Sequence, residues 1–144
     1  MTVTKFSELL QLEEELMNGS VGEVKNPISE SIKEHKGTVD DPIPFPHVIY
    51  SGTVRKLVRA VYNFNDANPD YDLYNYMNVL QQHGYTDIDI LSIDVTEMNE
   101  KCIMALFMAL VCGERFYDGL ILDAMEKGSV KRWFRRLKEL VTDN

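Results

Sequence analysis

The amino-acid sequence predicts an all-α fold, with five or six helices in a compact orthogonal or bundle-like array and one extended, proline-containing strap. Apolar residues recur at intervals of three and four through most of the chain, which is the period of helices that bury one face. Four of the five prolines fall between residues 20 and 50. With 144 residues the chain is long enough for a single domain, which we divide into an N-terminal helix at 1–19, the strap at 20–50 and a helical core at 51–144.

The N-terminal helix is expected to end at Gly19, because glycine is common just beyond a helix C-terminus. In the strap, Pro42, Pro44 and Pro46 each disfavour helix at the residue before them, and they therefore predict extended backbone. The apolar residues between these prolines favour a strap packed on the domain over a free linker.

The longest apolar run is CIMALFMALVC, from Cys102 to Cys112. A membrane span needs about 20 residues, so we expect a buried core helix and no membrane association. That helix is predicted to begin at Asp94, where Asp94 and Glu97 match a capping box, and to end at Gly113. The two cysteines fall on different faces of it, which predicts free thiols. Free thiols and an N-terminus too acidic for a signal peptide indicate the cytoplasm.

Further helices of the core are expected at 51–65, 71–84, 114–128 and 129–144. Gly113 and Gly128 are predicted to form short corners between the last three helices, so that neighbours in sequence become neighbours in space. The alternating stretch DIDILSID, at 87–94, has the period of a strand but no partner strand. We therefore expect an extended link or a helical turn there.

Composition and motifs exclude several classes of function. The net charge of −8 disfavours nucleic acid and anionic membranes as partners, although residues 129–144 carry five basic and only two acidic residues. His35, His47 and His83 are dispersed, so we expect no metal site. Phosphate-binding loops, nucleophile elbows and paired-acid motifs are absent from the sequence. We therefore name no catalytic residue and no cofactor, and lean away from an enzyme.

The stretch GERFYDGLILDAMEKGS, residues 113–129, has a functional and a structural interpretation. Arg115, Tyr117, Asp118 and Asp123 could bind a polar ligand, with the guanidinium as a fork for carboxylate or phosphate. Alternatively, Arg115 and Asp118 form an i,i+3 pair on a helix, and Gly119 in the middle of that helix lets a neighbouring helix approach closely. We favour the structural interpretation.

Two more regions are candidates for binding. Tyr71 and Tyr74 lie in the aromatic stretch YNFNDANPDYDLYNY, which either binds a protein or ligand or forms a half-buried corner. Arg132, Arg135 and Arg136 lie in the basic segment KRWFRRLKEL. That segment is either a core helix whose basic residues complement its own C-terminus and the acidic body, or a helix that binds a partner.

The C-terminal half resembles a known family. The stretch ALFMALVCGERFYDGLILDAMEKGSVKRWFRRLKEL resembles the ending of an uncharacterised family of small bacterial proteins, a domain of unknown function. The stretch YSGTVRKLVRAVY is similar to that family's Tyr-Ser-led helix. The resemblance covers about residues 48–141. It implies a helical, cytoplasmic bacterial protein, and it supplies no catalytic residues.

These observations favour a non-enzymatic protein-interaction or regulatory module of a bacterial cytoplasm, which binds another protein through the aromatic region or the basic C-terminal helix. The alternative is a small-molecule-binding protein or enzyme, with a pocket between the Tyr-rich region and the Arg115–Asp118 corner. A third hypothesis is an accessory protein of a nucleic-acid system. An exposed apolar face on the first helix would indicate a homodimer.

Overall fold

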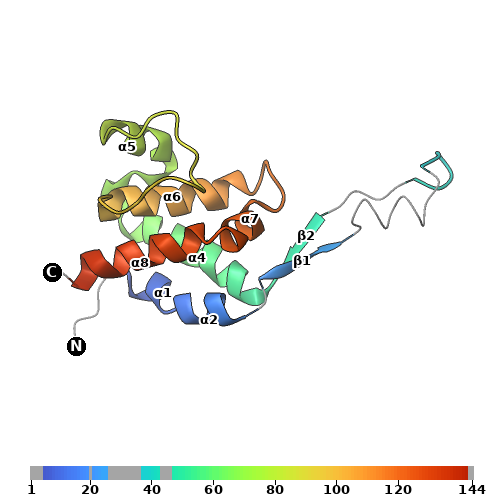
Figure 1. Cartoon of the computed structure of the whole chain (residues 1–144), viewed down its shortest axis with the longest axis horizontal. Helices are drawn as coiled ribbons and strands as arrows, with labels where there is room; N and C mark the ends of the chain where they lie inside the picture. Colours follow the sequence, from blue (N-terminus) through green and yellow to red (C-terminus); the bar gives the residue numbers. More distant parts are fainter. Residues whose placement is uncertain (1–4, 20, 26–36, 43–46, 143–144) are drawn as a thin grey trace.

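A computed structural model describes residues 5–19, 21–25, 37–42 and 47–142, and it confirms the predicted mostly helical fold (Figure 1). The helices, the strands and two short 3-10 helices follow in this order: α1 (Ser7–Leu10), α2 (Glu13–Asn18), β1 (Gly22–Lys25), β2 (His47–Tyr50), α4 (Gly52–Ala67), η1 (Pro69–Tyr71), η2 (Leu73–Asn75), α5 (Tyr76–Gln82), α6 (Glu100–Gly113), α7 (Leu120–Glu126) and α8 (Ser129–Thr142). In these ranges we find no helix with the length and apolar character needed to cross a membrane.

Helix α6 lies at the centre of the helical body. Every residue from Cys102 to Val111 is buried, so α6 is apolar on all sides rather than on one face. Helices α4, α5, α7 and α8 each contact it (Figure 1). The prediction of a buried core helix in this run is confirmed.

Aromatic side chains join α8 to α6. Phe107 of α6 meets Trp133 and Phe134 of α8 edge to face, with ring centroids 5.3 and 5.2 Å apart. The predicted apolar face of the last helix is buried at Val130 and Leu137 as well, and it becomes half-buried toward the C-terminal end. This packing turns the opposite, polar face of α8 outward.

The predicted N-terminal helix is two short helices, α1 and α2, and Gly19 follows α2 as expected. Its apolar face packs inside the chain, because Phe6, Leu9 and Leu16 are buried. The Phe6 ring stacks on Phe64 of α4, with centroids 5.3 Å apart. Other residues of the same chain therefore cover the buried part of this face.

Part of the predicted strap forms an antiparallel pair of strands. The register places Gly22, Glu23, Val24 and Lys25 opposite Tyr50, Ile49, Val48 and His47. The Ser51 N–H donates to the Val21 carbonyl at 2.8 Å, so these two residues form a hydrogen-bonded pair. Hydrogen-bonded and non-hydrogen-bonded pairs alternate along an antiparallel ladder, which makes Val24 and Val48 a non-hydrogen-bonded pair. The Val48 N–H therefore points away from β1. The sequence predicted only extended backbone here, and residues 43–46, which include Pro44 and Pro46, lie outside the described residues.

The predicted capping box of α6 is wrong. Helix α6 begins six residues later than expected, and the side chain of Asn99 caps it by accepting from the Cys102 N–H at 2.9 Å. Asp94 instead closes a local turn, because it accepts from the Thr96 N–H at 2.9 Å. Asparagine and aspartate favour both roles, so composition alone does not separate them.

The helix expected at 71–84 is shorter than predicted. Asp72 adopts a left-handed backbone with φ of 53°, which separates η1 from η2 and delays the start of α5 to Tyr76. Gly84, with φ of 88°, lies just beyond the C-terminal end of α5, where glycine is common. The alternating stretch at 87–94 is irregular, as predicted, and contains no strand within those residues.

The helix expected at 114–128 is wrong in its first part. Residues 114–119 form turns, and α7 begins only at Leu120. Gly119 is therefore not in the middle of a helix, and its φ of +97° is a conformation that glycine adopts without strain. A Cβ added there would lie 3.3 Å from Cγ2 of Val48, so the close neighbour of Gly119 is strand β2 and not another helix.

Replacing Gly119 with alanine is expected to lower the free energy of unfolding by about 1–2 kcal/mol, because alanine is strained at this φ and its Cβ would crowd Val48. Gly52→Ala is the matched control, since a Cβ at Gly52 would meet nothing within 4 Å and that residue opens α4. Urea unfolding measures both variants. Equal stability of the two would contradict the role of the left-handed turn.

Candidate functional site

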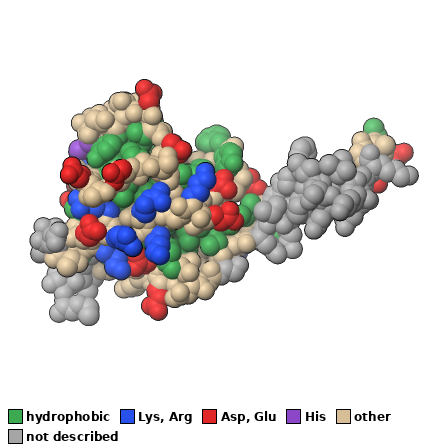
Figure 2. Space-filling model, in the orientation of Figure 1, with side chains coloured by type: hydrophobic (Ala, Val, Ile, Leu, Met, Phe, Trp, Pro, Cys, Tyr) green, Lys and Arg blue, Asp and Glu red, His purple; other side chains and the backbone are tan. Residues whose placement is uncertain are grey.

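The outward face of α8 carries the basic residues of the C-terminal segment. Lys131, Arg132, Arg135 and Lys138 are exposed there, and Arg136 is half-buried. Figure 2 shows lysine and arginine side chains gathered over this helix, with acidic side chains around them. On a chain of net charge −8, such a cluster creates a local positive field that attracts anionic groups.

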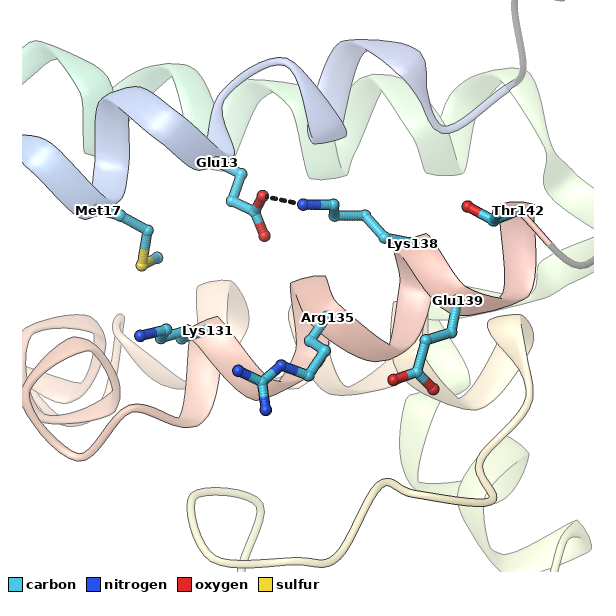
Figure 3. Close-up of a pocket in the computed structure, with 7 residues that line it drawn as sticks. All are labelled: Glu13, Met17, Lys131, Arg135, Lys138, Glu139 and Thr142. Carbon is cyan, nitrogen blue, oxygen red and sulfur yellow. Dashed lines mark hydrogen bonds and ion pairs between the residues drawn. The ribbon is translucent and has the colours of Figure 1, made fainter.

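A groove of about 520 Å³ lies between α2 and α8, and we name it the α2–α8 groove (Figure 3). It is lined by Glu13, Met17, Lys131, Arg135, Lys138, Glu139 and Thr142. Met17 points from α2 toward α8, so it gives the groove an apolar side chain among charged ones. The volume falls within the range of roughly 300–1,000 Å³ that is typical of ligand sites.

Three of the charges in the groove, those of Glu13, Lys138 and Glu139, are paired within the chain. The Lys138 Nζ lies 2.8 Å from Oε1 of Glu13, which joins α8 to α2. Glu139 pairs with Arg136 at 3.3 Å. The side chains of Lys131 and Arg135, by contrast, form no hydrogen bond or ion pair with any other residue of the described ranges. Their two charges, one turn apart on α8, are available to a ligand.

Arg132 and Arg136 hold the fold together instead. Nη2 of Arg132 donates to the Leu91 carbonyl at 2.7 Å, and Nε of Arg136 donates to the Met98 carbonyl at 2.8 Å. These bonds fasten the irregular segment before α6 onto α8. Of the three arginines that the sequence singled out on this helix, Arg135 is the one without a partner among the described residues.

Arg115 lies outside the α2–α8 groove, on a partly exposed aromatic cluster. Its Nη2 donates to Oη of Tyr62 at 3.0 Å, and the ring of Tyr62 lies 6.4 Å from that of Tyr74. Burial, followed by the hydrogen bond with Cys112, raises the pKa of Tyr62 above its ordinary value. The predicted pairing of Arg115 with Asp118 is wrong, since these two described residues form no ion pair with each other.

The other predicted residues of that region are dispersed. The Asp118 carboxylate accepts from the Val48 N–H at 2.8 Å and so covers the outer edge of β2. The Tyr117 hydroxyl donates to Asp123 at 3.2 Å, whereas Tyr71 is buried in the core. None of these side chains lines a groove described here, and neither do Arg115 and Tyr74.

Glu114, which the sequence did not single out, organises the corner between α6 and α7. Its carboxylate accepts from the N–H groups of Gly119 and Ile121, at 2.8 and 2.9 Å, and from the Tyr50 hydroxyl at 2.5 Å. The Tyr50 hydroxyl in turn accepts from the Leu122 N–H. Burial, and then the bond to Glu114, raise the pKa of Tyr50, which keeps the donating proton in place. One carboxylate thus caps α7 and fixes β2 upon it.

A second groove, of about 410 Å³, lies beside this corner, between β2, α4 and α7. It is lined by Val48, Ile49, Tyr50, Val54, Arg55, Val58, Glu114 and Ile121. Its walls are mainly apolar, and its carboxylate is already bonded to Tyr50 and α7. Within the described residues no group of three histidine, cysteine, aspartate or glutamate side chains is placed to hold a metal ion.

The model of a family of unknown function, DUF6508, matches residues 13–143. The chain belongs to this family. The match reaches further toward the N-terminus than the resemblance in the sequence, and it includes both walls of the α2–α8 groove, from Glu13 to Thr142. No curated protein and no solved structure matches the chain.

Two neighbouring arginines of this DUF6508 protein are expected to respond differently to removal of their charge. Arg136→Met should lower the free energy of unfolding by about 1–2 kcal/mol, because the Met98 carbonyl loses its donor. Arg135→Met is the matched control and should change stability by less than about 0.5 kcal/mol. Chemical unfolding of both variants measures the difference. If Arg135→Met lost as much stability as Arg136→Met, the conclusion that only Arg136 supports the fold would be refuted.

Removal of Glu114 is expected to destabilise this DUF6508 protein more than removal of an exposed acid at the other end of α7. Glu114→Ala leaves three donors without their acceptor and should cost about 2–3 kcal/mol of unfolding free energy. Glu126→Ala, at the exposed end of α7, serves as the control and should cost little. Thermal unfolding compares them, and similar midpoints would show that Glu114 does not organise the corner.

Proposed function

We propose that this protein is a non-enzymatic protein-interaction or regulatory module, which binds its partner through the α2–α8 groove and the adjoining basic face of α8. The observation that carries the proposal is the contrast among the basic residues of this helix. Lys131 and Arg135 are exposed without a partner in the described part of the chain, whereas Lys138, Arg132 and Arg136 are bonded within it. Unpaired arginine beside an apolar side chain is a common feature of protein interfaces.

The lining of the groove supports binding more than catalysis. Its side chains are two carboxylates, three basic groups, one methionine and one threonine, and no histidine or cysteine is among these described residues. A nucleophile held by a base, the usual core of a hydrolytic site, is therefore missing from this set. The arrangement supplies charge and apolar area, which are the means of recognition.

A cytoplasmic location is part of the same proposal. Cys102 is buried, Cys112 is half-buried, and neither forms a disulfide. Free thiols of this kind suit a reducing compartment. The bacterial origin implied by the family resemblance belongs to the proposal as well.

One observation favours the second candidate function, a small-molecule site near the Tyr-rich region. Half-buried Tyr62 brings the exposed Arg115 and Tyr74 into one cluster, in which an arginine and two aromatic rings meet. The guanidinium could bind a carboxylate or phosphate there, and a planar apolar group of the same ligand could stack on the rings. The cluster lines none of the grooves described above, so it offers a ligand little enclosure, and we rank this function below protein binding.

Charge reversal on α8 is expected to abolish partner binding without unfolding the protein. We predict that affinity capture from the native host retains a protein on the wild-type chain, and that Lys131→Glu/Arg135→Glu binds the purified partner at least about tenfold more weakly. Isothermal titration calorimetry with that partner measures the loss, and circular dichroism checks the fold.

Arg55→Glu/Arg59→Glu is the matched control for that experiment. These two exposed residues are also one turn apart, on α4, so the change in net charge is the same. Arg55 lines the second groove, beside β2. An equal loss of affinity in both double variants, or a loss of affinity in the α4 variant alone, would count against the α2–α8 groove as the binding surface.

A further inference from the structure

We propose that the α2–α8 groove takes an acidic protein segment, one that presents two carboxylates about one helical turn apart with an apolar side chain beside them. This inference rests on the proposed function and adds to it the chemistry of the partner. It is drawn from the spacing of the unpaired charges, from the apolar wall of the groove, and from a contact of the same kind that already exists inside the chain.

The internal contact shows which chemistry α8 accepts. Helix α2 is an acidic helix that already lies beside α8, and its Glu13 reaches Lys138 at 2.8 Å. The remaining basic residues of the groove, Lys131 and Arg135, continue the same face of α8 toward its N-terminal end (Figure 3). An acidic segment laid along that end would repeat the contact that α2 makes at Lys138.

The spacing of the free charges defines the ligand. Lys131 and Arg135 are four residues apart, so their Cβ atoms are about 5–6 Å from each other on one side of the helix. Two carboxylates one turn apart on a helical segment have the same separation. Arginine can also take a carboxylate through two parallel N–H donors, which adds a preferred orientation.

The other lining residues limit where the acids and the apolar side chain can sit. Met17 stands on the α2 side of the groove and faces α8, so an apolar side chain of the segment meets it there (Figure 3). Glu139 lies beyond Arg135, toward the C-terminal end of α8, and repels a third acid at that end. The segment is therefore expected to carry its acids over the first half of α8 only.

The same lining disfavours a nucleic-acid backbone. Phosphates repeat at regular intervals along a strand, whereas Glu13 and Glu139 interrupt the basic residues of the groove. The net charge of −8 repels a polyanion as a whole. A short acidic segment with an apolar residue avoids both costs, because its charges are few and its other atoms are neutral.

A pair of synthetic helical peptides tests the partner chemistry on the full chain. One peptide carries two glutamates one turn apart with a leucine between them, and its twin carries glutamines in their place. Chemical shifts of backbone amides in the ¹⁵N-labelled protein report binding and its location even when affinity is low. We expect the glutamate peptide to bind about fivefold more tightly than its twin and to shift Met17, Lys131 and Arg135.

Variants sharpen the test. Lys131→Glu/Arg135→Glu should remove the preference for glutamate, while Arg55→Glu/Arg59→Glu should keep it. Glu139→Gln should strengthen binding of the glutamate peptide, because a like charge is removed beside Arg135. Higher salt concentration should weaken the binding of the glutamate peptide and leave the binding of its twin nearly unchanged.

Three outcomes would overturn the proposal: equal affinity of the two peptides, no shift at the groove with either, or tighter binding at these residues of an oligothymidine strand. The last outcome would assign the surface to nucleic acid. Failure of this inference remains distinguishable from failure of the proposed function. A captured partner that needs Lys131 and Arg135, together with peptides of equal affinity, would reject the acidic segment and leave the interaction surface standing.

Discussion

The structure depends on the burial of α6 on every side. A helix with one apolar face needs a single neighbour, whereas ten consecutive buried residues, from Cys102 to Val111, need cover all around. Each buried leucine, isoleucine, methionine or phenylalanine contributes about 1.5–3 kcal/mol relative to exposure. Helices α4, α5, α7 and α8 supply the cover, and each must direct its apolar face inward. The charged face of α8 is therefore exposed as a consequence of how the core is closed.

The elements that bury the most surface were also the ones predictable from sequence. Helices α4 and α8 were recognisable because their apolar residues keep one period over three turns or more, and α6 was recognisable by its continuous apolar run. The failures lie where a single residue decides the backbone. Asp72 and Gly119 adopt left-handed conformations that interrupt otherwise helical patterns, and Asn99 outcompetes Asp94 as a cap. The pairing of β1 with β2 was also missed, because it joins short segments more than 20 residues apart.

The candidate site was predictable only in part, for a related reason. Composition pointed to the basic residues of the last helix, but it gave Arg132, Arg135 and Arg136 equal weight. What separates them is the position of two carbonyls, Leu91 and Met98, in a segment without regular structure. Glu13 and Met17 were not singled out because they reach α8 across more than 100 residues of sequence. Residues that meet only in the folded chain, and lie this far apart in the sequence, form no local sequence motif.

The basic side chains of α8 thus fall into two rows, one bonded to the fold and one that includes the unpaired Lys131 and Arg135. The row that contains Arg136 is fixed by backbone carbonyls, so changes there disturb the fold, while Lys131 and Arg135 can change without loss of internal bonds. The acidic character of the rest of the chain gives this division a further consequence. A negative charge is attracted near the basic face of α8 and also near Arg55, Lys56 and Arg59 of α4, while the net charge of −8 repels it elsewhere. What distinguishes the α8 surface from α4 is therefore the combination of the unpaired Lys131 and Arg135 with the apolar side chain of Met17, rather than positive charge alone.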